Sequence, residues 1–175
     1  MRITRRDSSI YKILVILTHA FILFIAFILQ TSIFPLITFL RSSPNLVLII
    51  VFTYGLLYGE NIGIIIGIAA GLLFDMYFDE TFGVYVLIYS IIGYINGSLN
   101  SSFYGDSISL AMILCVANSF VYNMYIYIIH FLIRGRFNFI YCLFNIMLPN
   151  ILFTLIINII VYKFLYDFNV LKKDK

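Results

Sequence analysis

The sequence predicts an all-α integral membrane protein, a bundle of about six transmembrane helices, and three observations lead to this fold class. Of the 175 residues, 63% are hydrophobic and 11% are charged, which leaves too little polar surface to cover a water-soluble domain. Several uncharged intervals exceed the roughly 20 residues with which a helix crosses the bilayer. The apolar runs do not alternate with polar residues, as the strands of a membrane barrel would.

Charged and turn-forming residues divide the chain into six predicted helices within a single transmembrane domain, residues 1–175. The helices are predicted over residues 12–34, 44–59, 61–78, 82–100, 107–133 and 143–167. Pro35 is expected to end the first helix, and Pro44 fits the first turn of the second. The second and third helices are long enough only if Glu60 lies at a membrane interface and Asp75 is tolerated near a helix end.

Lysine and arginine predict the orientation of the bundle, because the cytoplasmic side of a membrane protein carries an excess of both. With six spans, the two termini lie on the same side of the membrane. That side carries Arg2, Arg5, Arg6, Lys12, Lys163, Lys172, Lys173 and Lys175. The opposite side carries Arg41, Arg134 and Arg136. This asymmetry predicts that both termini are cytoplasmic.

Glycine recurs at every fourth position from residue 55 to residue 71, and Asp75 continues the series. A step of four residues turns only about 40° around a helix, so such residues form one ridge. Small residues at this spacing let the backbone of another helix approach closely. The ridge is therefore either a packing surface inside the protein or a docking surface for a partner protein or a ligand. Its candidate residues are Gly59, Gly63, Gly67, Gly71 and Asp75.

Asp75 is the one acidic residue placed within a predicted span and not at a hairpin or at the last residue of a span. A charge in the bilayer is costly, so this carboxylate either lies at the interface or has a specific partner. The partners considered are water, asparagine or serine on neighbouring helices, and Arg41. We expect Asp75→Ala to be more harmful than Asp79→Ala, because Asp79 can be hydrated. The asparagines within the predicted spans are expected to form hydrogen bonds between helices. The four asparagines considered for this role are Asn96, Asn100, Asn118 and Asn150.

The sequence contains no motif for catalysis, for a metal or cofactor, or for nucleic-acid binding. Cys115 and Cys142 lie outside any CxxC or Cys/His cluster, and His19 and His130 stand alone. The patterns G-x-S-x-G, H-E-x-x-H and a phosphate-binding glycine loop are missing. No block of like charges suggests a nucleic-acid surface. We therefore expect a protein that is not an enzyme and that is surrounded by the lipid bilayer.

An order of prolines, glycines and tyrosines runs from residue 44 to residue 97. Pro44-Asn45-Leu46 opens a helix, and the glycine series ends in Gly71-Leu72-Leu73-Phe74-Asp75. Gly83, Gly93 and Tyr94 follow. This order resembles the bacterial rod shape-determining protein MreD family. That family usually has aspartate after the proline, where this chain has Asn45.

The resemblance implies a non-enzymatic membrane subunit of the cell-elongation (rod) complex, involved in cell shape and in peptidoglycan synthesis along the lateral wall. It implies a place beside MreC and, through the complex, beside RodA, its partner transpeptidase and MreB. It also implies the bacterial cytoplasmic (inner) membrane. The family is similar in fold to the substrate-binding subunits of energy-coupling-factor transporters. A small-solute (vitamin-like) binding subunit of a membrane transporter is therefore the alternative function.

Overall fold

The computed structural model describes residues 18–36, 43–78, 82–100, 108–132 and 139–173. The predicted all-α class is confirmed, because these residues form helices and contain no strand. Most of the charged residues used to predict the orientation lie outside the described residues. They are Arg2, Arg5, Arg6, Lys12, Arg41, Arg134, Arg136 and Lys175. Asp79 and Glu80 also lie outside them.

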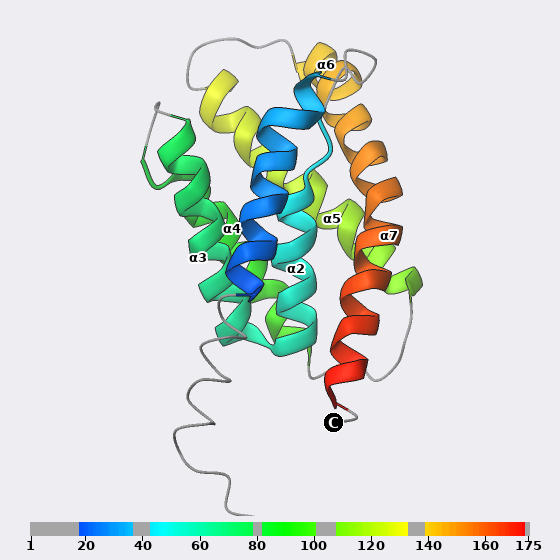
Figure 1. Cartoon of the computed structure of the whole chain (residues 1–175). Helices are drawn as coiled ribbons and strands as arrows, with labels where there is room; N and C mark the ends of the chain where they lie inside the picture. Colours follow the sequence, from blue (N-terminus) through cyan, green and yellow to red (C-terminus); the bar gives the residue numbers. More distant parts are fainter. Residues whose placement is uncertain (1–17, 37–42, 79–81, 101–107, 133–138, 174–175) are drawn as a thin grey trace, which may run out of the picture.

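Six helical stretches make up the described part of the chain (Figure 1). The first is the N-terminal helix, Thr18–Leu36. It is followed by α2 Leu46–Tyr58, α3 Glu60–Tyr77, α4 Val84–Ser98 and α5 Ile108–Tyr127, which continues as the π-helix η4 Ile128–Leu132. The last stretch joins α6 Phe139–Cys142, the π-helix η5 Leu143–Met147 and α7 Leu148–Lys173.

Four of these stretches are long and apolar enough to cross a membrane: Thr18–Leu36, Glu60–Tyr77, Ser109–His130 and Phe139–Lys163. The other two, α2 and α4, are shorter apolar helices. The sequence predicted six spans, of which the second and third were close to the length limit, whereas the two shorter helices of the structure are the second and the fourth. Helix α2 packs within the protein, and a helix so covered need not reach both membrane surfaces, because other helices can satisfy polar groups at its ends. Helix α4 buries one face and leaves Leu87, Ile91 and Tyr94 exposed on the other.

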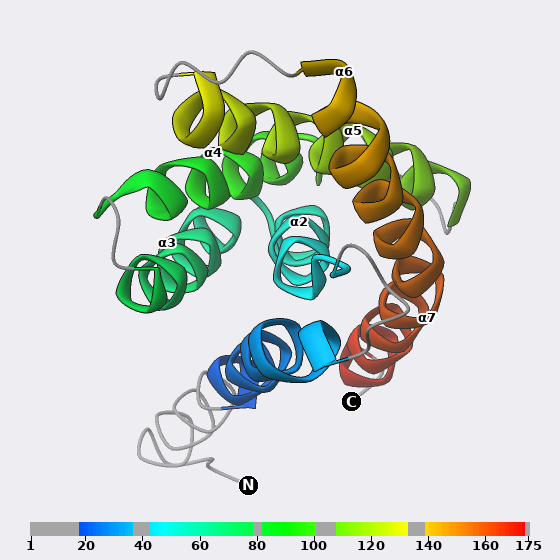
Figure 2. The ribbon, with the colours of Figure 1, turned by 90° about the horizontal axis from the view of Figure 1, so that it is seen from above.

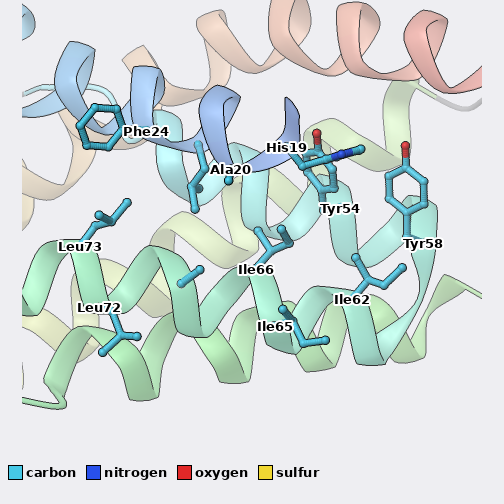
Figure 3. Close-up of a pocket in the computed structure, with 12 residues that line it drawn as sticks. His19, Ala20, Phe24, Tyr54, Tyr58, Ile62, Ile65, Ile66, Leu72 and Leu73 are labelled. Atoms are coloured by element: carbon cyan, nitrogen blue, oxygen red, sulfur yellow. The ribbon is translucent and has the colours of Figure 1, made fainter. Parts of the chain in front are cut away.

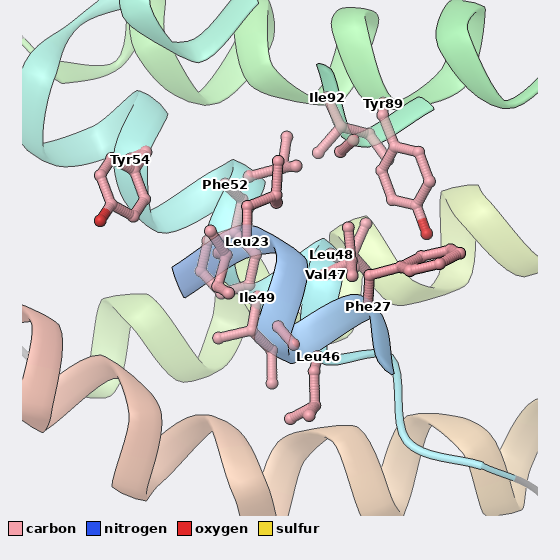
Figure 4. Packing of buried hydrophobic residues seen from close by; sticks show 14 of the residues in the cluster. Leu23, Phe27, Leu46, Val47, Leu48, Ile49, Phe52, Tyr54, Tyr89 and Ile92 are labelled. Atoms are coloured by element: carbon pink, nitrogen blue, oxygen red, sulfur yellow. The ribbon is translucent and has the colours of Figure 1, made fainter. Parts of the chain in front are cut away.

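Helix α2 lies at the centre of the bundle, surrounded by the other helices (Figure 2). Every residue from Leu46 to Leu56 is buried, because the helix is apolar on all sides and meets protein on all sides. Figure 4 shows Leu23 and Phe27 of the N-terminal helix packed beside α2, with Tyr89 and Ile92 of α4 nearby. The core of this membrane protein is therefore built around α2.

Two prolines within the described helices each follow a π-helical turn. The turn Leu29–Ile33 precedes Pro35, which lies in a short 3-10 helix, Phe34–Leu36. The π-helix η5 precedes Pro149. Proline has no N–H group and its ring clashes with the carbonyl four residues earlier, so a regular α-helix cannot pass through it unchanged. The first helix thus changes form before Pro35 instead of stopping there, and the wider turn accommodates each proline.

Candidate functional site

Three glycines of the predicted ridge lie directly against the backbone of α4. A Cβ atom placed at Gly63, Gly67 or Gly71 would come closer than 3.0 Å to backbone atoms of α4, a distance that real Cβ atoms essentially never show. The helices therefore touch through their main chains, which only glycine permits. The backbone atoms met belong to Gly93, Tyr89, Ser90, Val86 and Tyr85.

Glycines on α4 and α2 complete this contact from the other side. A Cβ atom at Gly93 would meet the backbone of Gly63, and one at Gly97 would meet the backbone of Glu60. Gly55 of α2 joins them, because its Cβ would lie 2.7 Å from the carbonyl oxygen of Gly93. Three helices thus meet where Gly55, Gly63 and Gly93 come together. The sequence placed these glycines in one series or motif but did not indicate which helices they would join.

Gly59 has a different role from the other ridge glycines. Its φ angle is +90°, it separates α2 from α3, and a Cβ atom there would have no neighbour within 4 Å. Gly83, at the start of α4, is similar, with a φ angle of +99° and no neighbour within 4 Å. Both glycines have a positive φ angle, which other residues rarely adopt, and Gly83 lies in the left-handed helical region. Gly59 therefore forms the turn before α3, and its backbone also lies against α4, because a Cβ atom at Gly97 would come within 2.8 Å of the Gly59 carbonyl carbon.

The carboxylate of Asp75 caps the beginning of α4. Asp75 is only 4% exposed, and its two oxygens accept hydrogen bonds from the backbone N–H groups of Gly83, Tyr85 and Val86. The donor–acceptor distances are 3.0, 3.0 and 3.1 Å. The first N–H groups of a helix have no partner within the helix, and the helix N-terminus attracts negative charge. Gly83 has no side chain with which to cap α4, so Asp75 supplies the cap from α3.

This arrangement differs from the partners that the sequence suggested for Asp75. Neither asparagine nor serine side chains provide the three hydrogen bonds described here, and Arg41 lies outside the described residues. Only an indirect pattern in the sequence pointed to this cap: an aspartate near the end of one predicted helix is followed by a glycine at the start of the next. Together with the glycine contact, the cap fixes α3 against α4 along their length.

Asn45 caps the buried beginning of α2. Its side-chain oxygen accepts a hydrogen bond from the N–H group of Leu48 at 2.9 Å and one from the hydroxyl of Tyr89 at 3.3 Å. Its own N–H group donates to the hydroxyl of Thr154 on α7 at 3.0 Å. Gln30 of the N-terminal helix accepts from the N–H group of Val47 at 3.0 Å. The start of α2 is thus hydrogen-bonded to three surrounding helices.

The family model described as rod shape-determining protein MreD matches residues 10–169, nearly the whole chain. The chain belongs to the MreD family. The match includes the Asn45 cap, the glycine contact and the Asp75 cap, so these features lie within the MreD region. Searches among curated proteins and among solved structures gave no match. The expected likeness to transporter subunits therefore stays a prediction, whereas a multi-pass membrane protein of the rod shape-determining MreD family is established.

Other polar residues of this MreD protein also join helices. Asn96 on α4 and Asn118 on α5 form two reciprocal side-chain hydrogen bonds of 2.9 and 3.0 Å. Asn150 accepts from Asn123 at 3.0 Å and donates to the carbonyl of Ser43 at 2.7 Å. Asn100 donates to the carbonyl of Leu56 on α2. The prediction that asparagines within the spans form hydrogen bonds between elements is confirmed for Asn96, Asn100, Asn118 and Asn150.

The remaining motif residues take separate positions. Pro44 is buried beside Asn45, whereas Tyr94 is 50% exposed and lies next to the buried Gly93 on α4. Within the described ranges, no group of three or more histidine, cysteine or acidic residues could hold a metal ion. The geometry of these residues can hold helices together and present an apolar exterior, and it offers no pair of reactive groups among the residues described above.

Proposed function

We propose that this MreD protein is a non-enzymatic subunit of the cell-elongation (rod) complex, and that it works by binding other membrane proteins. It lies in the bacterial cytoplasmic membrane and supports peptidoglycan synthesis along the lateral wall. Its immediate partner is MreC, and through the complex it acts beside RodA, its partner transpeptidase and MreB. The observation that carries the proposal is that Asn45, Asp75 and Asn96, which are buried within the bundle, bind other side chains or the backbone.

This use of polar groups favours a scaffold over an enzyme. An intramembrane enzyme needs reactive side chains that converge on a substrate and remain available to it. Asp75 instead binds three backbone N–H groups, and Asn96 binds Asn118. A scaffold needs a rigid bundle whose outer surface faces lipid and partner helices, and these internal bonds provide that rigidity.

The same observation bears on the alternative, a subunit that binds a vitamin-like solute. Such a site needs several polar groups aimed into a pocket to orient the ligand. The polar groups at the start of α2 are joined to each other through Asn45, Tyr89 and Thr154. The large cavity between the N-terminal helix and α3 is lined almost wholly by apolar side chains. Both features support the scaffold over the solute-binding subunit.

Depletion in a rod-shaped host, combined with purification of the native protein, tests the proposal. We expect rounded cells after depletion and MreC among the proteins that co-purify. Normal rods after complete loss, in a host without a paralogue, would contradict the role in cell shape. An ATPase module that co-purifies with a bound vitamin would instead support the transporter subunit.

We also propose that both termini are cytoplasmic. The Thr18 end of the first helix and the Lys173 end of α7 lie at the same end of the bundle (Figure 1), which supports an even number of crossings. The test uses single cysteines in a chain that lacks Cys115 and Cys142. We expect a membrane-impermeant reagent to label Glu80→Cys in intact cells and to leave Lys173→Cys unlabelled. The reverse pattern would contradict the orientation.

A further inference from the structure

A large groove separates the N-terminal helix from α3. Its volume is about 970 Å³, and Figure 3 shows the side chains that line it. The N-terminal helix contributes Ala20 and Phe24 on one wall, and α3 contributes Ile62, Ile66 and Leu73 on the other. This is the opposite situation from the α3–α4 contact, because here two neighbouring helices leave space between them.

The groove is closed toward the C-terminal end of α3. There, the ring of Phe27 on the N-terminal helix packs edge-on against Phe74, with 5.1 Å between ring centroids, and against Tyr77 at 5.7 Å. The two helices therefore touch at this end and stand apart toward the α2–α3 turn. A helix of a partner protein that crosses the whole bilayer could not lie between them without breaking these aromatic contacts.

The length of the groove matches half of a bilayer. Its lining on α3 extends from Ile62 to Leu73. At 1.5 Å per residue this distance is about 16 Å along the helix. The hydrocarbon core of a bilayer is about 30 Å thick, so one leaflet contributes about 15 Å. An occupant that belongs to a single leaflet fits this length.

Polar groups are gathered at one end of the groove. His19, Tyr54 and Tyr58 lie together there (Figure 3), with ring centroids of His19 at 5.0 Å from Tyr54 and 5.9 Å from Tyr58. Tyr58 is the last residue of α2 and directly precedes the turn with the exposed Glu60. Tyrosine at such a position is typical of the interface between hydrocarbon and headgroups. The groove thus runs from a polar mouth to an apolar interior.

We infer that this groove binds the acyl chains of a glycerophospholipid from the leaflet at the α2–α3 turn, with the phosphate group near Tyr58. The one-leaflet length, the aromatic closure and the polar mouth all fit an amphiphile that enters from one membrane surface. The lining favours lipid over a helix, because helix partners in membranes are held by small residues, and most of the lining consists of bulky residues such as Ile62, Ile66 and Leu73.

Lipid retention by the full-length protein tests this inference. The protein is purified in mild detergent, stripped of loosely held lipid, titrated with phosphatidylglycerol and measured by native mass spectrometry. Ala20→Phe places a ring in the groove, and Ala117→Phe is the matched control, because Ala117 is also exposed but lies on α5. We expect one retained lipid in the wild type and in Ala117→Phe, and loss of that lipid in Ala20→Phe. Equal lipid numbers in all three proteins would show surrounding bilayer lipid only and would overturn the inference.

Photo-crosslinking of the wild-type protein gives a second test that does not depend on a variant folding. Phosphatidylglycerol that carries a diazirine at the methyl end of an acyl chain should label Leu72, Leu73 or Phe24. The same lipid with a diazirine beside the glycerol should label Ile62. Labels spread evenly over exposed residues of α5, such as Ile113, would overturn the inference.

Discussion

Helix α3 packs against its two neighbours in opposite ways. On one face, Gly63, Gly67 and Gly71 bring its backbone into contact with the backbone of α4. On the other face, Ile62, Ile66 and Leu73 line a groove of about 970 Å³ that separates it from the N-terminal helix. Both faces are apolar and both belong to the same helix. Apolar character alone therefore does not decide whether two helices in this protein come together.

The difference shows what holds helices together where lipid is the solvent. Lipid tails are as apolar as leucine, so bringing two apolar helix faces together gains little from the hydrophobic effect. Close backbone approach gains dispersion contacts over many atoms, and hydrogen bonds add to it. The α3–α4 face has both, through its glycines and the Asp75 cap. The groove face lacks them, so lipid can compete for it.

The largest expected effect comes from adding bulk to the glycine face. Gly67→Leu or Gly71→Leu would place a branched side chain against main-chain atoms of α4, which cannot move aside without separating the helices. Overpacking typically costs about 1–3 kcal/mol, and a backbone obstacle should put these variants at the upper end. We expect the protein to be lost from the membrane fraction, measured by immunoblot, while Ala117→Leu stays at the wild-type level.

Other outcomes of this experiment would change the comparison. Wild-type abundance and function would mean that the glycine face tolerates bulk and that its packing role is wrong. Normal abundance with loss of MreC in a pull-down would instead make the ridge, directly or through a change in shape, part of a docking surface.

A somewhat smaller effect is expected when the cap of α4 is removed. Asp75→Ala leaves the N–H groups of Gly83, Tyr85 and Val86 without their acceptor. Each unsatisfied buried donor costs about 1–3 kcal/mol, although water can recover part of this near a helix end. We expect a lowered midpoint of thermal unfolding in detergent, a smaller loss for Asp75→Asn, which keeps one acceptor oxygen, and little change for Asp79→Ala. Equal midpoints for Asp75→Ala and Asp79→Ala would contradict the role of the cap.

Adding a single methyl group to α4 at Gly93 tests the contact between α3 and α4 with a smaller change. Gly93→Ala would place a Cβ atom closer than 3.0 Å to the Gly63 carbonyl. Alanine gains up to about 1 kcal/mol of helix propensity over glycine, which opposes the steric cost. We still expect net destabilisation of about 1 kcal/mol, because the obstacle is backbone and overpacking costs about 1–3 kcal/mol. The control is Tyr94→Ala, at the exposed neighbouring position. If the Gly93→Ala protein is as stable as this control, α4 can move away from α3 at no cost.

The smallest effect is expected on the groove face. Ile65 lines the groove and is 63% exposed. Ile65→Ala should change the free energy of unfolding by no more than about 0.5 kcal/mol, as is usual for a substitution outside a packed contact. Unfolding in detergent at matched lipid content measures this value. A loss as large as that of Gly93→Ala would mean that the groove walls are packed more tightly than the open space between them indicates.

Several features of the fold followed from residue pattern alone. Pro35 was expected to end the first helix, and the α-helical hydrogen bonding changes just before it, because proline lacks the N–H group that the helix needs. Asn96 and Asn118 formed the expected bond between helices, because an amide group surrounded by apolar residues must find a partner. Gly59 was less predictable. It occupies the same spacing as Gly63, and only the chain direction at that point shows that it forms a turn.

The sequence by itself determined a helical membrane protein and a chain segment capable of close helix contact. Uncharged apolar runs must satisfy their backbone groups internally, and a glycine every fourth residue gives one helix face without side chains. Only the tertiary structure decided that α4 covers this face and that Asp75 caps the beginning of α4. The physical reason is that the partners in both cases are backbone atoms. Every residue carries backbone atoms, so no residue type in the sequence indicates which backbone atoms the glycines and Asp75 will contact.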